Sequence, residues 1–377
     1  MNTLRVLIVM PLATSLGGGE LMLRQLLRHG RNQGVEWMVV YLRDGPMVAE
    51  TRALGIEAHV VPSGRFRELF KRVGVVRGVA AIARQFRADL ILGWMVAGEL
   101  TAGPAAMLAG VPNVWYQVGT PRPDWLDRTA TLFPARGVIV LSRGGAAAQS
   151  RVWPPRKQWL VYPGVSLDAF NPDGLAAPVT LRAKFGLPTT GPLIGIVGRL
   201  QRWKGMDVFL DAIPAILVRY PDVHAVIIGG PHETEPRYPA ELQARVQTLG
   251  ISRAVTFAGF QSNVPEWMQA MDIVVHASDH EPFGIVVIEA MALGKPVVAG
   301  AEGGPSETIT PGVDGLLSPF GDAAALATSV LRYLDDPSFA VQVGAAARKR
   351  AQQFDDRRYA VNVIAALQES AARRAVT

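Results

Sequence analysis

The sequence predicts an α/β protein with two doubly wound parallel sheets, each covered by helices. Short apolar runs alternate with helical segments, as in parallel strands joined by crossover helices, and the pattern restarts in the second half. A stretch rich in Pro, Gly and Asn separates the halves. The length of 377 residues is sufficient for two domains.

Each half contains a series of expected strands, and a turn or helix follows each of them. In the first half the strands are expected at Leu4–Met10, Glu36–Leu42, Ala58–Val61, Asp89–Leu92, Asn113–Tyr116 and Val138–Leu141. In the second half they are expected at Leu193–Val197, His224–Ile228, Ala254–Phe257, Ile273–His276, Pro296–Ala299 and Gly315–Leu317.

The domain boundary is expected in the breaker-rich segment that begins at Pro163 and Gly164. We therefore predict an N-terminal domain at residues 1–165, a linker at 166–180 and a C-terminal domain at 181–354.

The composition excludes several classes of protein. Hydrophobic residues make up 49% of the chain and charged residues 19%, which is typical of a globular protein. The chain has no cysteine, so disulfide scaffolds and thiolate metal sites are excluded, and its six scattered histidines predict no metal site. No signal peptide or transmembrane helix is expected, since Gly and Pro interrupt the long uncharged stretch 100–121. A cytoplasmic location is predicted.

Positive charge is concentrated in the first half. Residues 1–172 contain 20 Lys plus Arg and 11 Asp plus Glu, whereas residues 173–377 contain 18 and 21. The densest part, from Arg65 to Arg87, interleaves cations with apolar residues. The favoured interpretation is a solvated helix face beside a core face, and the alternative is docking on an anionic membrane surface, the inner face of the cytoplasmic membrane. No nucleic-acid-binding motif is present, so nucleic acid is not an expected partner.

Candidate binding residues lie in loops after expected strands, where open α/β sheets bind ligands. The first is the glycine-rich turn before the first helix. Glycines at a helix N-terminus expose backbone amides to anions, so Gly17 and Gly18 are candidates for phosphate binding. Neither the dinucleotide fingerprint nor a P-loop is present.

Two cations flank the turn after the first strand of the second half. Arg199 and Lys204 together can neutralise a diphosphate, although two solvated surface cations would give the same pattern.

Two carboxylates and a helix start follow in the segment 278–292. Glu281 precedes Pro282 near the expected helix N-terminus, whose first amides can bind phosphate. Glu289 lies two turns later among apolar residues, so its carboxylate needs either a ligand such as vicinal hydroxyls or a structural ion pair. Gly303 and Gly304 follow the next strand, where they can admit a ligand.

These motifs together resemble the retaining glycosyltransferases of family 4. The resemblance rests on Gly17-Gly18-x-Glu20, Pro163-Gly164-Val165 with Phe170, Gly198-Arg199-(x4)-Lys204-Gly205, Glu281-(x7)-Glu289 and Gly303-Gly304-(x2)-Glu307. It implies a GT-B fold, in which two Rossmann-like domains face a central cleft. The N-terminal domain would bind the acceptor and the C-terminal domain the nucleotide sugar. Residues 355–377 would form a helix that crosses back to the N-terminal domain.

The resemblance also implies roles for the candidate residues. Arg199 and Lys204 would bind the donor diphosphate, Glu281 the transferred sugar and Glu289 the ribose hydroxyls. Backbone amides of Phe283, Gly284 and Ile285 would bind phosphate or sugar oxygens, and Gly17 and Gly18 would approach the phosphates from the other domain. Members of the family retain anomeric configuration. No metal and no cofactor beyond the nucleotide sugar is expected.

The acceptor side departs from the family pattern. Gln117 stands where many relatives have a histidine, and glutamine is no base at neutral pH. Trp94 and Trp115 are further candidates for contact with the acceptor, which would be a glycan, a lipid-linked molecule or a small molecule.

The predicted function is sugar transfer from a nucleotide-diphosphate sugar to a hydroxyl in the synthesis of a cell-surface polysaccharide, glycolipid or glycoside. Two alternatives stay open from the sequence. One is a GT-B epimerase or phosphorylase, and the other is a noncatalytic protein that binds sugar nucleotides or glycans.

Overall fold

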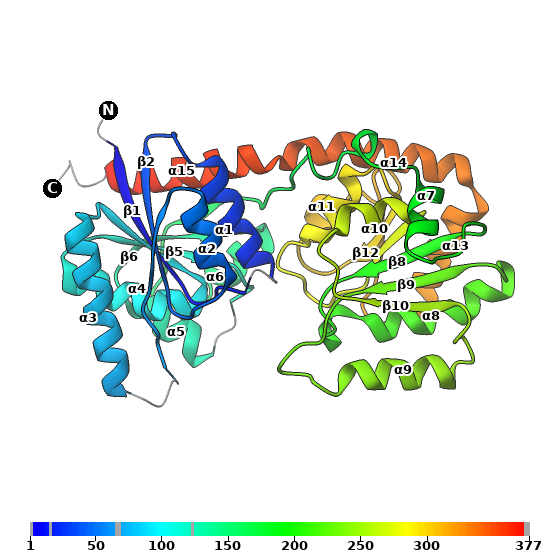
Figure 1. Cartoon of the computed structure of the whole chain (residues 1–377), viewed down its shortest axis with the longest axis horizontal. Coiled ribbons are helices and arrows are strands. Elements are labelled where there is room, and N and C mark those ends of the chain that lie inside the picture. Colours follow the sequence, from blue (N-terminus) through cyan, green and yellow to red (C-terminus); the bar gives the residue numbers. More distant parts are fainter. Residues whose placement is uncertain (1–2, 15–16, 65–68, 122–123, 373–377) are drawn as a thin grey trace. The chain divides into compact units, whose positions relative to one another are not determined.

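The computed structural model describes residues 3–14, 17–64, 69–121 and 124–372 (Figure 1). The chain divides into two compact units, one formed by residues 1–164 and 356–377 and the other by residues 165–355. Residues 166–180, which we expected as a linker, therefore belong to the second unit. Arg348 of that unit donates hydrogen bonds to Asn171 and Asp173, at 3.0 and 2.7 Å.

The first unit contains a parallel sheet of seven described strands in the order β3-β2-β1-β4-β5-β6-β7. The strands are β1 (Leu4–Met10), β2 (Val35–Tyr41), β3 (Glu57–Val60), β4 (Leu90–Trp94), β5 (Asn113–Gln117), β6 (Ala135–Val140) and β7 (Gln158–Leu160). The first six overlap the strands expected from the sequence, whereas β7 was not expected.

Helices cover both faces of this sheet. They are α1 (Gly18–His29), α2 (Pro46–Ala53), α3 (Leu69–Phe86), α4 (Met95–Ala109), α5 (Trp125–Leu132), α6 (Arg143–Gln149) and α15 (Asp356–Ala372). Buried residues of α3 and α4 pack with residues of β1, β2 and β4 in one core cluster. The C-terminal helix α15, drawn in red in Figure 1, packs against α1 and β6, so the last helix returns to the unit in which the chain begins.

The second unit contains a parallel sheet of six described strands in the order β10-β9-β8-β11-β12-β13. They are β8 (Leu193–Val197), β9 (His224–Ile228), β10 (Val255–Gly259), β11 (Ile273–His276), β12 (Val297–Gly300) and β13 (Leu316–Ser318). All six overlap strands expected from the sequence.

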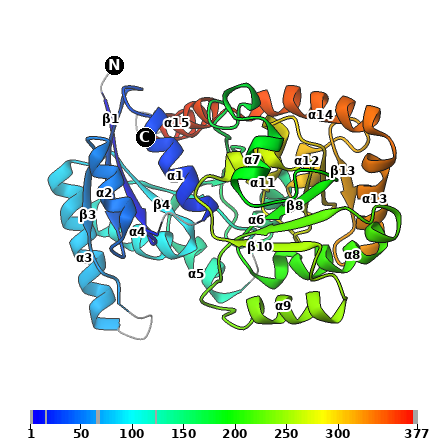
Figure 2. The same cartoon turned by 45° about the vertical axis from the view of Figure 1, so that its right-hand side comes forward.

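Its helices are α7 (Pro178–Lys184), α8 (Met206–Arg219), α9 (Tyr238–Thr248), α10 (Val264–Ala270), α11 (Ile285–Ala292), α12 (Pro305–Thr308), α13 (Ala323–Asp335) and α14 (Pro337–Ala351). Three 3-10 turns lie at Pro172–Gly174, Arg202–Lys204 and Gln352–Phe354. In Figure 2, α8 and α9 lie on one side of the sheet, and α11 and α12 lie on the other.

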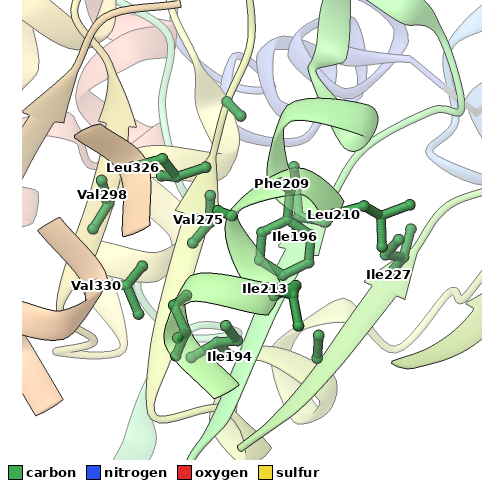
Figure 3. Close-up of a cluster of buried hydrophobic side chains, with 14 of the residues drawn as sticks. Ile194, Ile196, Phe209, Leu210, Ile213, Ile227, Val275, Val298, Leu326 and Val330 are labelled. Atoms are coloured by element: carbon green, nitrogen blue, oxygen red, sulfur yellow. The ribbon is translucent and has the colours of Figure 1, made fainter. Parts of the chain in front are cut away.

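Figure 3 shows the core between the sheet and α8 and α13. Phe209 and Ile213 of α8 pack with Val330 of α13 over Ile196 and Val275 of the strands. Buried strand residues of this kind fix the sheet, so that the loops at its carboxyl end have a rigid support.

The structure buries the apolar side of α3 in its own unit. Val75, Val79 and Ala83 are buried, whereas Lys71 and Arg77 are exposed. This is the first interpretation of the basic stretch, a solvated face beside a core face. Arg65 and Arg67 lie outside the described residues, and the membrane interpretation stays a prediction. No helix in the described parts of the chain is long and apolar enough to cross a membrane.

Candidate functional site

The two loops that carry most of the predicted donor residues are held together by backbone contacts. The loop after β8 ends at Gly205, which has a φ of +66°, and a Cβ there would stand 2.1 Å from the carbonyl oxygen of Ala277. The amide of Asp279 donates to the carbonyl of Trp203 at 2.7 Å. These contacts bring the turn with Lys204 beside the segment with Glu281.

Lys204 and Glu281 form an ion pair at the carboxyl end of the sheet. Nζ of Lys204 lies 2.5 Å from Oε2 of Glu281, and each side chain is 13% exposed. His276, the last residue of β11, approaches the same oxygen with Nε2 at 3.2 Å. The motif-based prediction brought Lys204 and Glu281 to one site, but it did not include His276.

The electrostatics of this cluster keep Glu281 ionised. Burial by itself would raise the pKa of the Glu281 carboxyl, but the charge of Lys204 and the hydrogen bond from His276 outweigh burial and hold that pKa well below its usual range. Glu281 is therefore a hydrogen-bond acceptor at neutral pH, suited to hydroxyl groups.

Two further polar atoms lie near the ring of His276 and beside a small cavity. Nδ1 of His276 and Oγ of Ser318 are buried, with no hydrogen-bond partner among the described residues. Both residues line a cavity of about 10 Å³, about the space that one water molecule needs.

Gly303 and Gly304 pack against the backbone that carries Glu281. A Cβ at Gly303 would lie 2.2 Å from the carbonyl oxygen of Glu281, and one at Gly304 would lie 2.2 Å from Cα of Phe283. The amide of Gly304 donates to the carbonyl of Glu281 at 2.7 Å. The contact between the two loops therefore depends on the missing Cβ atoms, and the expectation that these glycines admit a ligand stays a prediction.

The N-terminus of α11 offers backbone amides beside Glu281. Gly284 precedes the helix with a φ of 88° and makes no side-chain cap hydrogen bond, and among the described residues the amide of Val287 donates to its carbonyl at 2.9 Å. Such uncapped amides and the helix dipole favour an anion. The side chain of Phe283 is buried against Phe354, so only its backbone is available for the predicted role.

Glu289 lies in α11 and is 8% exposed. Within the described parts of the chain its carboxylate has no hydrogen bond or ion pair, and burial raises its pKa to about 7. The alternative interpretation, a structural ion pair, is therefore not found there, and a carboxylate in this state has unfilled acceptor capacity.

Arg199 differs from Lys204 in its surroundings. It follows β8 and is exposed, and its side chain makes no hydrogen bond or ion pair among the residues described. Its guanidinium thus keeps its five donors for an anion.

In the first unit, the glycine-rich turn lies close to two flexible side chains. Gly17 precedes α1, and a Cβ at Gly17 would stand 2.6 Å from Oε2 of Glu20. A Cβ at Gly19 would stand 2.0 Å from Cε of Met95. The carboxylate of Glu20 is buried at the start of the helix and accepts a hydrogen bond from Thr14 at 2.9 Å. The predicted phosphate contacts of Gly17 and Gly18 would therefore lie next to a carboxylate.

The acceptor-side candidates do not face solvent in this unit, which corrects our expectation. Trp94 is 0% exposed, stacks on Tyr116 and donates to the carbonyl of Gly19 at 3.1 Å. Trp115 is 1% exposed in an apolar cluster. Gln117 is 3% exposed and donates to Asp127 at 2.9 Å. Because β4 and β5 are buried on both faces of the sheet, all three side chains lie inside the protein, so none offers a surface for contact with the acceptor.

Comparison with known families identifies the chain. Residues 179–350 match the glycosyl transferases group 1, and residues 16–169 match glycosyltransferase family 4. The chain belongs to the family 4 glycosyltransferases. This family 4 chain is 36% identical over 201 residues to the D-inositol 3-phosphate glycosyltransferase of Corynebacterium urealyticum, covering 52% of this chain and 47% of that protein. The Streptomyces avermitilis protein of the same name is 36% identical over 202 residues, covering 52% of this chain and 43% of that protein. The chain spans about half the length of the curated relatives it matches.

Solved structures resemble this family 4 chain over nearly its whole length. The Anabaena protein HepE, crystallised with UDP-glucose, superposes with a TM-score of 0.85 at 26% identity, covering 97% of this chain and 99% of that chain. Sucrose-phosphate synthase from Thermosynechococcus elongatus superposes with a TM-score of 0.84 at 22% identity, covering 98% of this chain and 100% of that chain, and shows the shared fold. The predicted GT-B fold, with two Rossmann-like domains, is confirmed.

Proposed function

We propose that this chain is a retaining glycosyltransferase that moves a sugar from a nucleotide-diphosphate sugar to a hydroxyl acceptor. The products would be cell-surface polysaccharides, glycolipids or glycosides. The observation that carries the proposal is the group of Lys204, Glu281 and the uncapped amides of α11 at the carboxyl end of the second sheet, with the partnerless carboxylate of Glu289 in the same helix.

Each part of this group suits one part of a donor. Lys204 has three N–H donors, so it can keep Glu281 and still reach a phosphate oxygen, while Arg199 supplies a second cation. The first amides of α11 add donors for the same anion. Glu281 would accept hydrogen bonds from sugar hydroxyls, and Glu289 from the two ribose hydroxyls.

The reaction would depend on stabilising the leaving nucleoside diphosphate. Negative charge grows on the bridging phosphate oxygen as the bond to the sugar breaks, and preorganised donors stabilise such charge strongly. In the proposed retaining route, the departing phosphate oxygen accepts the proton of the acceptor hydroxyl on the same face of the sugar. This route needs no metal and no protein nucleophile.

Nucleotide binding tests the donor site directly. We expect one of UDP, GDP, ADP and dTDP to raise the melting temperature in the presence of EDTA, and a hundredfold excess over Kd corresponds to about 2.7 kcal/mol. UDP is the first choice, because HepE was solved with UDP-glucose. The shift should shrink in Glu289→Gln and persist in Asp222→Asn, an exposed carboxylate in the loop before β9.

Product analysis then tests the reaction. With the matching nucleotide sugar, NMR of the product should show the anomeric configuration of the donor. An inverted product would contradict the retaining route, and an altered free nucleotide sugar would indicate an epimerase. No shift with any of the four nucleotides would contradict the donor site.

A further inference from the structure

A cavity lies inside the first unit, lined by residues other than those assigned to the donor. Its volume is about 330 Å³, within the usual range of small-molecule sites. Residues after β1, β2 and β3 line it together with residues of α3 and α4. It therefore opens at the carboxyl end of the first sheet, where α/β sheets bind ligands.

The lining of this cavity is mainly apolar. Its walls include Pro11 and Leu12 after β1, Leu42 after β2, and Val75 and Val76 of α3. Leu42 and Val75 are 3% and 7% exposed, so these side chains are fixed in the core rather than free at the surface. A ligand that displaces water from such walls must itself carry an apolar group.

The charged residues of the lining are both cations. Arg43 follows β2 and Arg72 belongs to the first turn of α3, and no acidic residue is among the described lining residues. The carboxylate nearest to Arg43 in sequence, Asp44, accepts a hydrogen bond from the amide of Gly45 at 2.8 Å and does not line the cavity, and the carboxylate nearest to Arg72, Glu68, lies outside the described residues. Two guanidinium groups beside an apolar pocket complement an anion attached to an apolar body.

We propose that this cavity binds an anionic amphiphile, a phosphate ester or carboxylate with an apolar chain or ring, and that the acceptor belongs to this class. The assignment to the acceptor rests on the proposed transferase function, whereas the binding of an anionic amphiphile does not. Arg43 and Arg72 would hold the anionic group, and Leu42, Val75 and Val76 would contact the apolar body. This would place acceptor selection in the loops after β2 and β3, not at Trp94, Trp115 or Gln117.

Three probes test the contributions of the anionic group and of the apolar chain separately. Octyl phosphate below its micelle concentration carries both features, octyl glucoside only the chain, and inorganic phosphate only the anion. We expect calorimetry to show that octyl phosphate binds at least about tenfold more tightly than either of the other two probes. Octyl glucoside lacks the contact with the cations, and inorganic phosphate lacks the contact with the apolar walls. Equal binding of octyl glucoside or of inorganic phosphate would overturn the proposal.

Substitutions at Arg43 and along α3, each with a matched control on α3, locate the site. Arg43→Gln and Arg72→Gln should each weaken octyl phosphate about tenfold, as expected for the loss of a charge-assisted contact, without changing octyl glucoside. Arg77→Gln, an exposed cation outside the cavity, should leave binding within about twofold.

Val76→Asn should weaken octyl phosphate and octyl glucoside alike, whereas Val73→Asn, at a position 43% exposed and outside the lining, should not. Equal losses in the paired variants would place the ligand elsewhere and overturn the proposal.

Vesicles distinguish a lipid from a soluble ligand. Sedimentation with phosphatidylcholine vesicles that contain phosphatidic acid, lost in Arg43→Gln but kept in Arg77→Gln, would support the proposal with a lipid as the ligand. No sedimentation, together with octyl phosphate binding, would support it with a soluble ligand. Sedimentation lost equally in both variants would indicate surface docking of the basic stretch and overturn a lipid in the cavity.

The nucleotide shift, measured on the same variants, separates this proposal from the proposed function. If the variants keep the nucleotide-induced thermal shift but neither they nor the wild type bind octyl phosphate, the proposal for the cavity is overturned and the proposed transferase function stands. Binding of octyl phosphate without any nucleotide effect would leave the binding site and remove its role as acceptor site.

Discussion

At the scale of single residues, Glu289 is a group that costs stability when no ligand is present. Its pKa is raised by burial from 4.5 to about 7. As the pH rises through this range, the unfolded chain releases the proton first while the folded state still holds it, so stability falls and then stays lower above about pH 7. At about 1.4 kcal/mol for each pKa unit, the cost amounts to about 3 kcal/mol.

Glu289→Gln removes this cost. Without nucleotide, the variant should exceed the wild type in unfolding free energy of the second unit by up to about 3 kcal/mol at pH 8, and the gain should nearly vanish at pH 4. Urea unfolding at both pH values measures the difference. With the nucleotide bound, the advantage should shrink, because only the wild type gains the ribose contact. Asp222→Asn, an exposed control, should show no comparable pH-dependent gain, and an unchanged Glu289→Gln would contradict the burial of an uncompensated charge.

The sequence identified Lys204, Glu281 and Glu289 through their motifs, but it did not show their surroundings. The ion pair between Lys204 and Glu281 depends on contacts between loops that lie about 75 residues apart, and such contacts leave no local pattern. His276 belongs to a strand and has no motif, so its contact with Glu281 was not predictable. Its position as the last residue of an expected strand was the only available signal.

At the scale of elements, the turn before α8 requires glycine for two separate reasons. Gly205 has a φ of +66°, which costs about 1–2 kcal/mol for other residues, and a Cβ would also collide with the carbonyl of Ala277. Gly186 has a φ of +68°, with nothing within 4 Å of its Cβ position. Comparing an Ala substitution at Gly205 with one at Gly186 therefore separates the cost of backbone strain from the loss of the contact between the two loops.

Gly205→Ala should destabilise the second unit more than Gly186→Ala, which should cost only about 1–2 kcal/mol. The same variant should weaken the nucleotide-induced thermal shift, since it pushes the Lys204 turn away from Ala277, whereas Gly186→Ala should keep the shift. Urea unfolding and nucleotide titration of both variants check this. If the two variants behave alike, the contact between the loops does not position the site.

The strands were largely predictable, and their exceptions have physical reasons. Apolar runs such as Leu193–Val197 are buried on both faces and coincide with β8. β7 escaped prediction because it has only three residues, pairs only with β6 among the described strands and has half-buried or exposed side chains. The same burial on both faces misled us at Trp94 and Trp115, where aromatic side chains near strand ends suggested a binding surface but fill the core.

At the scale of the whole molecule, the first unit is completed by the last helix of the chain. Tyr359 of α15 accepts a hydrogen bond from Tyr116 of β5 at 2.9 Å. Asp356 packs on Gly164, where a Cβ would stand 2.4 Å from Cα of Asp356, and its carboxylate lies 3.1 Å from Nε2 of His29. The first unit therefore cannot complete its core until the second has been synthesised.

Truncation after Asp355 should unfold the first unit and spare the second. Removing buried Tyr359, Val363 and Leu367 would cost about 2–5 kcal/mol for each large apolar side chain, a total comparable with the 5–15 kcal/mol that stabilises a whole domain. Calorimetry should show the transition of the second unit alone, and the nucleotide should still shift it, because every residue assigned to the donor except Gly17 and Gly18 lies in residues 165–355. Truncation after Ala372 is the control and should leave both units folded. If truncation after Asp355 keeps both unfolding transitions, the first unit folds without α15. If it abolishes both transitions, the two units do not fold independently.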